Sequence, residues 1–361
     1  MQPSLSPRGK QPHAKRKEYK NSNTENTEPD NMNYCSSSLL SICRISINPP
    51  CLPITSVLMS SEQNRAKQGI LKMMKQKPLI TVYMPVFNAD KFLDQSISSI
   101  LSQTFSNFEF IIVDDASTDN SWKIIKSHAK KDKRIIPIKN KINLGVSLTS
   151  NIAISQSHGK FLARMDADDI SFPNRLERQL KFLQKNKSVI ATGSQCIVID
   201  KDDNVVGNKN FPTQFKKLKN MIFWAVPIQQ PSMMINLDKL PKNFTWYQAN
   251  QTSAEEIDLM FKLMKYGKIS NLKENLLFYR HLDSSLSHKN PKDTFKLTLK
   301  SRFNALKLGF KPSFLAVLIN LIQIIAVALI PSQLINNLWN IIRGIKKPTG
   351  LTVASFAQSQ L

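Results

Sequence analysis

The sequence predicts an α/β domain with a mainly parallel sheet flanked by helices. Between residues 78 and 165, short apolar runs typical of buried strands alternate with segments whose apolar residues recur at helical spacing. Such alternation implies right-handed crossovers between parallel strands, with helices covering both faces of the sheet. A second observation is that polar clusters follow several of the apolar runs, and ligands of such sheets bind beyond the carboxyl ends of the strands.

The expected elements begin at Pro78, and each is short. The first apolar run is ended by Pro85, and the second by an acidic stretch. The strands are expected at 79–84, 108–113, 135–138 and 161–165, and the helices at 91–101, 122–129 and 148–157. Because parallel strands end at the same edge of a sheet, Asn88 and the clusters 114–119 and 166–169 are expected to share one crevice.

The last of these strands runs directly into the acidic residues Asp166, Asp168 and Asp169. Carboxylates crowded at one strand end repel each other, so the arrangement is tolerable mainly when a cation lies among them. Hard oxygen ligands suit Mg2+ or Mn2+, and such an ion would hold phosphate oxygens. The alternative is an Asp-rich turn that caps a helix beginning near Pro173.

The composition points to an anionic partner. The formal net charge of +24 and the pI near 9.9 predict attraction to nucleic acid, to a nucleotide substrate, or to a membrane with acidic lipids. Charge alone does not choose among these. The four cysteines show no paired spacing, which argues against a zinc site and against a disulfide framework, and a reducing cytosol fits best.

The chain divides into three parts by composition. Residues 1–76 mix basic clusters with Ser, Asn and Pro and show no sustained period, so they are expected to be a disordered N-terminal extension. Residues 77–290 carry the alternating pattern of the expected α/β domain. Residues 291–361 are expected to form a helical, membrane-associated segment, since 314–330 is an apolar run of about 17 residues, near the lower limit for spanning hydrocarbon.

That apolar run includes the polar residues Asn320 and Gln323, which favours a re-entrant or interfacial helix hairpin over a membrane span. The expected location is the cytoplasmic face of a membrane, as a peripheral or monotopic protein. The alternative is an ordinary helix pair packed on the domain. Basic residues flank the run and would meet an anionic membrane surface. They are Lys307, Lys311, Arg343, Lys346 and Lys347.

Residues 78 to 287 resemble a family 2 glycosyltransferase of the GT-A fold, a Rossmann-like fold. The resemblance depends on several short motifs at family-like spacing. They are Met84–Asn88, Ser99–Thr104, Val113–Asp119, Asn143–Gly145 with Asn151, Met165–Asp169 and Ala254–Leu259. The resemblance implies an inverting, metal-dependent enzyme that moves a sugar from a nucleotide-sugar donor to a hydroxyl of a sugar or lipid-linked acceptor. Relatives of this type assemble cell-surface polysaccharide or lipopolysaccharide.

The resemblance also implies which residues bind the donor and the metal. Asp168 and Asp166 match the family's Asp-x-Asp pair, which would hold Mn2+ or Mg2+. Asp119 has an alternative role as a helix cap, and Asn143 with Gly145 could form only a turn. The expected donor-binding residues are Pro85, Phe87, Asn88, Asp114, Asp115, Ser117, Asn143, Gly145, Asn151, Asp166 and Arg280.

Transfer to a hydroxyl requires a general base, because the acceptor is a poor nucleophile until its proton is removed. The family's acidic dipeptide is matched here by Glu255 and Glu256, with Glu256 as the expected base and Asp258 as the fallback. The family usually has Asp at the second position, and the extra methylene of Glu changes the reach by about 1 Å. The alternative is structural, since Ser253 and Glu256 have the spacing of a capping box.

Two departures from the family pattern leave other functions open. Gln230 stands where close relatives often have His, and His281 is shifted by one position in the segment Tyr279–His281. A catalytically degenerate scaffold that binds nucleotide sugars is therefore one alternative, and an enzyme of different phosphate chemistry, a nucleotidyltransferase, is another. A basic nucleic-acid-binding protein is disfavoured, because acids at the expected crevice would repel a phosphate backbone.

Overall fold

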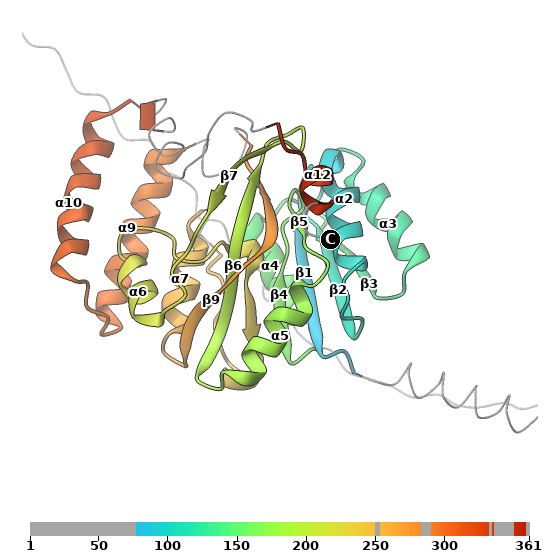
Figure 1. Ribbon diagram of the computed structural model, residues 1–361, viewed down its shortest axis with the longest axis horizontal. Coiled ribbons are helices and arrows are strands. Elements are labelled where there is room, and N and C mark those ends of the chain that lie inside the picture. Colours follow the sequence, from blue (N-terminus) through green and yellow to red (C-terminus); the bar gives the residue numbers. More distant parts are fainter. Residues whose placement is uncertain (1–76, 250–252, 283–289, 332–333, 336–349, 359–361) are drawn as a thin grey trace, which may run out of the picture. The chain divides into compact units, whose positions relative to one another are not determined.

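A computed structural model describes residues 77–249, 253–282, 290–331, 334–335 and 350–358 (Figure 1). The chain divides after Lys67 into two units, and every described residue belongs to the second, Gln68–Leu361. The expected disorder of residues 1–76 therefore lies outside the described residues, as do Arg343, Lys346 and Lys347 of the expected membrane segment.

The centre of the second unit is a nine-stranded sheet of order β3-β2-β1-β4-β8-β6-β9-β5, with β7 paired to β6. Its first half matches the predicted alternation of strands and helices. All three strand pairs of this half are parallel, as expected for strands joined by helical crossovers. The strands are β1 (Ile80–Val86), β2 (Phe108–Asp114), β3 (Ile135–Lys139) and β4 (Phe161–Arg164).

The second half of the sheet is mixed, so the prediction of a mainly parallel sheet holds only for the first half. Only β6 and β9 pair in parallel; β8 runs antiparallel to both β4 and β6, β7 to β6, and β5 to β9. A short turn suffices to join the antiparallel pair of β6 and β7, so no crossover helix marks them in the sequence. These strands are β5 (Ile170–Ser171), β6 (Val189–Ile199), β7 (Val205–Lys209), β8 (Met234–Asn236) and β9 (Lys268–Arg280).

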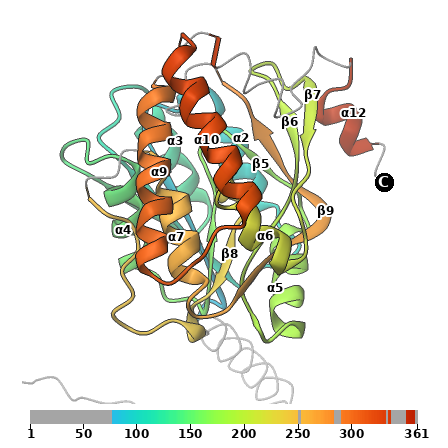
Figure 2. The same ribbon diagram turned by 90° about the vertical axis from the view of Figure 1, so that its left-hand side faces the viewer.

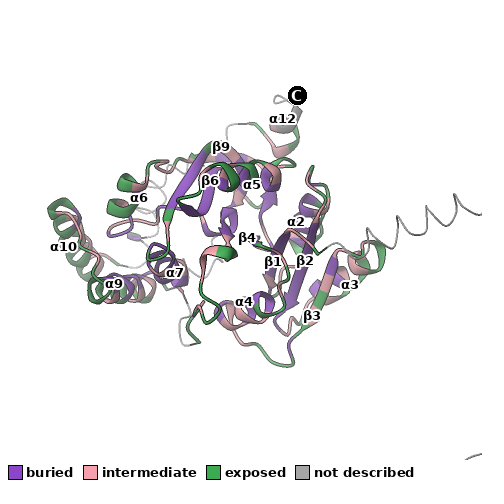
Figure 3. Cartoon of the chain, turned by 90° about the horizontal axis from the view of Figure 1, so that it is seen from below, coloured by how far each residue is buried: buried purple, intermediate pink, exposed green. Residues whose placement is uncertain are grey.

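Helices cover both faces of the sheet, and the alternation along β1 shows how. Val82 and Met84 pack in one hydrophobic cluster with α2 and α5, whereas Tyr83 packs in another with α4 and α7. Strands and α7 are mostly buried, whereas the outer helices are exposed on one side (Figure 3). The helices are α2 (Asp90–Leu101), α3 (Ser121–Lys131), α4 (Val146–Ser155), α5 (Arg175–Lys185), α6 (Phe215–Met221), α7 (Glu255–Leu263), α9 (Pro291–Lys307), α10 (Phe314–Leu329) and α12 (Val353–Gln358), with the 3-10 turns η1 (Gln230–Ser232) and η2 (Leu237–Lys239).

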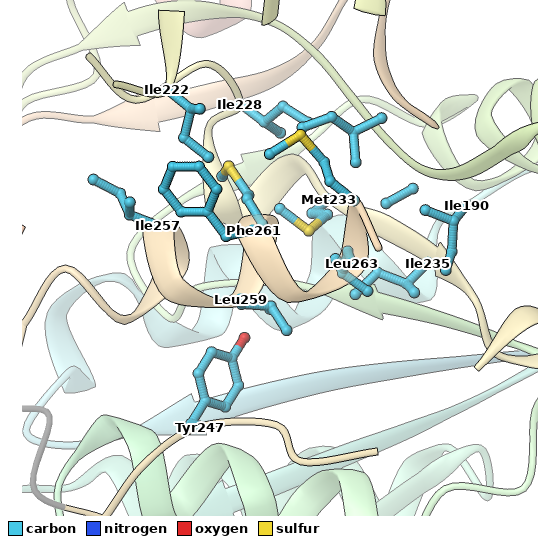
Figure 4. Close-up of a cluster of buried hydrophobic side chains, with 14 of the residues drawn as sticks. Ile190, Ile222, Ile228, Met233, Ile235, Tyr247, Ile257, Leu259, Phe261 and Leu263 are labelled. Carbon is cyan, nitrogen blue, oxygen red and sulfur yellow. The ribbon is translucent and has the colours of Figure 1, made fainter. Parts of the chain in front are cut away.

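Helix α7 lies inside the molecule rather than on its surface. Apolar side chains surround it on several sides, and Figure 4 shows Ile257, Phe261 and Leu263 pointing toward different neighbours. Leu259 points toward Tyr247, which lies on the segment before the helix. A helix that is apolar on several sides is held in place by packing, so its first residues have a defined position.

Helix α9 packs next to α7, and α10 lies alongside α9 (Figure 2). After them, residues 350–358 return to the sheet: Val205 N donates to Leu351 O (2.7 Å), and Phe356 packs against Phe172 and Phe278. Within the described part of the chain, no helix has both the length and the apolar character that a membrane crossing requires. The expected membrane association of 291–361 stays a prediction.

Candidate active site

Three loops meet at one edge of the sheet, as the sequence predicts. The parallel register pairs Val86 of β1 with Asp114 of β2, and Tyr83 of β1 with Arg164 of β4. The residues that follow these strands therefore leave the same edge. Loops 87–89, 115–119 and 165–169 form the frame of the candidate site, and α7 supplies a fourth part.

Asp115 organises the loop that precedes α4. Its Oδ1 accepts hydrogen bonds from Asn140 Nδ2 (2.7 Å) and Leu144 N (2.9 Å), and its Oδ2 accepts one from Gly145 N (2.8 Å). The side chain of Asn143 donates to the Asp115 carbonyl at 3.4 Å. Asp115 is 3% exposed, so this carboxylate is fully used inside the protein and fixes residues 140–145 against β2.

Asn88 and Ser117 tie the first two loops together. Asn88 N donates to Ser117 Oγ (3.0 Å), and Asn88 Oδ1 accepts from Thr118 N (2.9 Å). Asn88 and Ala116 both have positive φ, 48° and 58°, which is uncommon for residues with a Cβ. Asp119 accepts hydrogen bonds from Asp90 N (3.0 Å) and Ser121 N (2.9 Å), which are the first residues of α2 and α3, so it has the capping geometry proposed as its alternative role.

The other expected donor residues have different degrees of exposure. Phe87 is 51% exposed at the strand edge, and Pro85 is half-buried. Gly145 has φ +82° and open space where a Cβ would lie, so backbone can approach a ligand there. Asn151 instead faces inward and exchanges two hydrogen bonds with the main chain of Tyr247, at 2.9 and 3.1 Å, which places it among the supports of the site.

Asp114 is buried with zero exposure. Its Oδ2 accepts a hydrogen bond from Ser117 N (3.3 Å) and lies 3.8 Å from Lys139 Nζ. Its Oδ1 has no hydrogen-bond partner among the described residues. A buried carboxylate oxygen without a partner is costly, so this atom is available to a donor group on a ligand.

The acidic turn after β4 is held from two sides. Asp166 Oδ1 accepts a hydrogen bond from Arg164 Nε at 2.8 Å, and Asp169 Oδ1 accepts one from Arg280 N at 2.8 Å. Burial, and then the neighbouring Asp166 carboxylate, raise the pKa of Asp168 to about 6. Among the described residues, no three His, Cys or acidic side chains are grouped so that they could hold a metal ion by themselves.

Arg280 lies in a buried position at the end of β9 and not on an open loop. Its guanidinium donates to the carbonyl oxygens of Asp168 and Asp200, each at 2.8 Å, and pairs with Asp203. It also donates to Gln95 Oε1 (3.0 Å). These partners make Arg280 a positioning residue for the acidic turn, whereas its expected contact with the donor stays a prediction.

The acid pair of α7 lies at the first turn of the helix. Glu255 is 7% exposed and Glu256 is half-buried. Burial, and then the Glu255 carboxylate, raise the pKa of Glu256 to about 7, and burial also raises the pKa of Glu255. The N-cap position is occupied by Ala254 and not by Ser253, so the alternative of a capping box is wrong.

Ala254 has a left-handed conformation (φ 57°), which is unfavourable for a residue with a Cβ. The helix start is therefore fixed by its surroundings. Asp258, the fallback base, forms an ion pair with Lys262 (2.7 Å), and Lys262 also donates to the Trp246 carbonyl (2.8 Å). This pairing makes Asp258 a weaker candidate than Glu256.

Sequence reasoning missed a buried polar network that joins the acidic turn to the acid pair. Arg164, already bonded to Asp166, lies with Nη1 3.1 Å from the Gln230 side-chain oxygen, and the Gln230 nitrogen lies 3.2 Å from Glu255 Oε1, in the amide orientation that satisfies both neighbours. The hydroxyl of Tyr247 lies 3.1 Å from Gln230 and 2.9 Å from that of Tyr83. An arginine at the end of a buried strand, directly before acids, was the available signal.

Comparisons with known proteins find related glycosyltransferases. The model of the family described as "Glycosyl transferase family 2" matches residues 81–243. An uncharacterised glycosyltransferase of Methanocaldococcus jannaschii is 36% identical over 210 residues, which cover 56% of this chain and 71% of the relative. An uncharacterised glycosyltransferase of Haemophilus influenzae is 32% identical over 216 residues, covering 57% of this chain and 67% of the relative.

A relative with a more specific name comes from Escherichia coli. It is the "UDP-Glc:alpha-D-GlcNAc-diphosphoundecaprenol beta-1,3-glucosyltransferase", 29% identical over 215 residues, covering 58% of this chain and 79% of the relative. Each of these three relatives matches a little over half of this chain.

Proposed function

The chain belongs to glycosyltransferase family 2, and from that premise we propose that it is an inverting enzyme that moves a sugar from a nucleotide-sugar donor to an acceptor hydroxyl. The observation that carries this proposal is the acid pair of α7, in which Glu255 is joined through Gln230 and Arg164 to the acidic turn. The proposed base is the neighbour of Glu255, and a general base and an acidic turn are the two parts that such a transfer needs.

Glu256 is proposed as the base. With a pKa near 7 it can hold a proton and release it again at neutral pH, which is the condition for efficient general-base catalysis. The acceptor oxygen forms its bond to the anomeric carbon while the bond from that carbon to the diphosphate oxygen breaks. The acceptor proton passes to Glu256, and the single in-line displacement inverts the configuration.

The donor is proposed to bind along loops 87–89, 115–119 and 140–145. The unpartnered Oδ1 of Asp114 suits an N–H donor of a nucleobase or a ribose hydroxyl. Gly145 leaves room for close approach of the main chain. Because Asp115, Asn88 and Asn151 are bonded inside the protein, they are proposed to shape this pocket more than to touch the donor.

Asp168 and Asp166 are proposed to hold Mn2+ or Mg2+, since hard carboxylate oxygens at a strand end suit these ions. Because the described residues do not group three such ligands, diphosphate oxygens would complete the coordination. When bound, the cation would neutralise charge on the leaving nucleoside diphosphate.

The acceptor is proposed to be a sugar or lipid-linked sugar at the cytoplasmic face of a membrane, in polysaccharide or lipopolysaccharide synthesis. The name of the Escherichia coli relative supports this, because it specifies UDP-glucose as donor and a diphosphoundecaprenol-linked sugar as acceptor. UDP-glucose is therefore the first donor to test, together with a lipid-linked N-acetylglucosamine acceptor.

The testing experiment is a screen of nucleotide sugars, with and without MnCl2, for thermal stabilisation and for release of nucleoside diphosphate. We expect one donor to raise the melting temperature only with manganese, because a ligand bound to the native state alone stabilises it. Asp168→Ala is expected to abolish both signals. Donor binding without release in the presence of acceptors would favour the catalytically degenerate scaffold, and release of pyrophosphate would indicate a nucleotidyltransferase.

A further inference from the structure

Helix α10 carries its polar side chains toward the protein. Arg302 of α9 donates to Asn320 Oδ1 (2.8 Å) and Gln323 Oε1 (3.3 Å). Gln323 Nε2 in turn donates to the Trp224 carbonyl (3.0 Å), and Asn320 Nδ2 to the Phe223 carbonyl (2.5 Å). The two polar residues that interrupt the apolar run are therefore fully engaged by α9 and by the segment after α6.

The opposite side of α10 is apolar and exposed. Phe314 is 86% exposed, Ile322 and Ile325 are each 58% exposed, and Leu329 is 77% exposed. These residues share one stripe at helical spacing, to which Leu315, Leu318 and Leu321 also belong. A surface helix of a water-soluble protein normally exposes its polar side chains and buries its apolar ones. Helix α10 does the opposite, so this stripe marks an interaction surface.

Exposed lysines lie on α9, the helix beside the stripe. Lys296, Lys300 and Lys307 are exposed on α9, at a spacing that also includes the 65% exposed Phe303. Lys311 precedes α10, and Lys219 of α6 lies over the Phe310 ring at 5.9 Å. Asp293 is the only acid in the described stretch 290–331, so this part of the chain is strongly positive.

We infer that the exposed stripe of α10, with the lysines of α9, is a docking surface for a bilayer that contains anionic lipids. Helix α10 has 16 residues, about 24 Å at 1.5 Å per residue, which is short of the roughly 30 Å hydrocarbon core, so it lies in the plane of the interface. A second copy of the chain is a poorer occupant, because pairing of two such surfaces would bring like charges together.

This inference deepens the proposed membrane location and connects it to the site. Phe310, between α9 and α10, packs on Phe261 of α7 with ring centroids 5.3 Å apart, and Phe261 contacts Phe223 at 5.1 Å. Helix α7 carries the proposed base at its first turn. The docking surface is thus one helix away from the acid pair, which suits an acceptor presented by lipid.

The test measures sedimentation of the full chain with vesicles and uses no sugar, so its failure is distinct from failure of the proposed transfer. Wild type is expected to bind vesicles of phosphatidylglycerol and phosphatidylcholine. The double variant Ile322→Gln with Ile325→Gln is expected to bind about tenfold or more weakly, since two apolar side chains no longer enter the interface. The matched control, Ile142→Gln with Leu351→Gln, also alters two exposed apolar residues and is expected to bind as wild type does.

The charge contribution is tested with two triple Lys→Gln variants. Replacing the α9 lysines is expected to weaken binding to anionic vesicles about tenfold or more at low salt, and to leave any binding to pure phosphatidylcholine unchanged. The equivalent change on α3 is the control. The triplets are Lys296, Lys300 and Lys307 on α9, and Lys123, Lys126 and Lys130 on α3.

Three results would overturn the inference. Wild type could fail to bind anionic vesicles, or the Ile322 and Ile325 double variant could bind them as wild type does. The third result is a wild-type dimer that does not bind vesicles and that the double variant converts to monomer, which would make the stripe an interface between two copies.

Discussion

The donor-side loops and the acid pair of α7 are both rich in buried carboxyl groups, yet they are built in opposite ways. Asp115 and Asp119 each accept hydrogen bonds from main-chain N–H groups, and those bonds fix neighbouring loops and helix starts. Glu255 and Glu256 lie together at a helix start whose N-cap, Ala254, offers no side-chain acceptor or donor. Main-chain donors make the carboxylates of the loops part of the frame, whereas burial at the start of α7 raises the pKa of both glutamates.

The largest expected effect is a loss of catalytic rate when the acid pair of α7 is changed. Glu256→Gln should lower kcat by about 10² to 10⁴, because the amide keeps the size of the side chain but cannot accept the acceptor's proton. Nucleoside diphosphate release with donor and acceptor gives the rate, and donor-dependent thermal stabilisation should be unchanged. Glu274→Gln, at an exposed ion pair with Arg178, is the control. Full activity in Glu256→Gln would show that Glu256 is not the base.

The second expected effect is a loss of stability when a carboxylate of the donor-side loops is removed. Asp115→Ala removes the acceptor for Asn140, Leu144 and Gly145, so we expect a loss of about 3 kcal/mol in the free energy of unfolding. Urea denaturation followed by circular dichroism measures it. Asp94→Ala, at a 78% exposed side chain paired with His128, should change stability by less than about 0.5 kcal/mol. Equal effects of the two changes would contradict a structural role for Asp115.

A third experiment asks whether the acid pair costs stability. The pKa of Glu256 is raised from its ordinary 4.5 to about 7, so its ionisation is disfavoured in the native state. Below pH 4.5 the carboxyl is protonated in both states and has no penalty, and the penalty is complete above pH 7. Glu256→Gln should therefore stabilise the protein by about 3 kcal/mol at pH 8 and hardly at all at pH 4, because each pKa unit between 4.5 and about 7 corresponds to about 1.4 kcal/mol.

Thermal or urea unfolding at both pH values measures this difference. Destabilisation by Glu256→Gln at pH 8 would show that the ionised carboxylate makes a favourable native contact, which would place Glu256 with the frame rather than with the reactive pair.

The smallest expected effect is the pH dependence of the rate. Because the base must be ionised to accept a proton, kcat/KM should be about half of its plateau value near pH 7 and about a tenth of it at pH 6. Steady-state rates across a constant-ionic-strength buffer series measure the profile. Glu256→Asp should move the midpoint of this profile. A rate that does not change between pH 6 and 8 would show that ionisation of Glu256 does not control it.

Much of the first half of the fold could be predicted from local pattern. The strands 79–84, 108–113 and 161–165 and their shared edge follow from apolar runs and from the helices between them. The second half could not, because its pairings join distant segments: β8 is only three residues long, and it lies between β4 and β6 through antiparallel contacts that leave no local signal.

In the site, too, short motifs identify individual residues, whereas their contacts depend on segments that are far apart in the sequence. Glu256 was identifiable from a short motif, but its burial beside Glu255 depends on how α7 packs. Arg280 was expected among the donor-binding residues, and only the fold shows that β9 continues through it and that its buried guanidinium bonds to the acidic turn. Arg164 and Gln230 join two motifs separated by some ninety residues, so only the folded chain reveals that they form one network.

The bonds from Arg302 to Asn320 and Gln323 have a consequence for how the enzyme would work on a lipid surface. Pulling α10 away into hydrocarbon would strand a buried guanidinium without its two partners, at a cost of several kcal/mol. These bonds therefore hold α10 in a fixed position relative to the catalytic domain. A docked enzyme would keep Glu256 at one constant height above the headgroups, which would select acceptors by the distance between their lipid anchor and the sugar that receives the transfer.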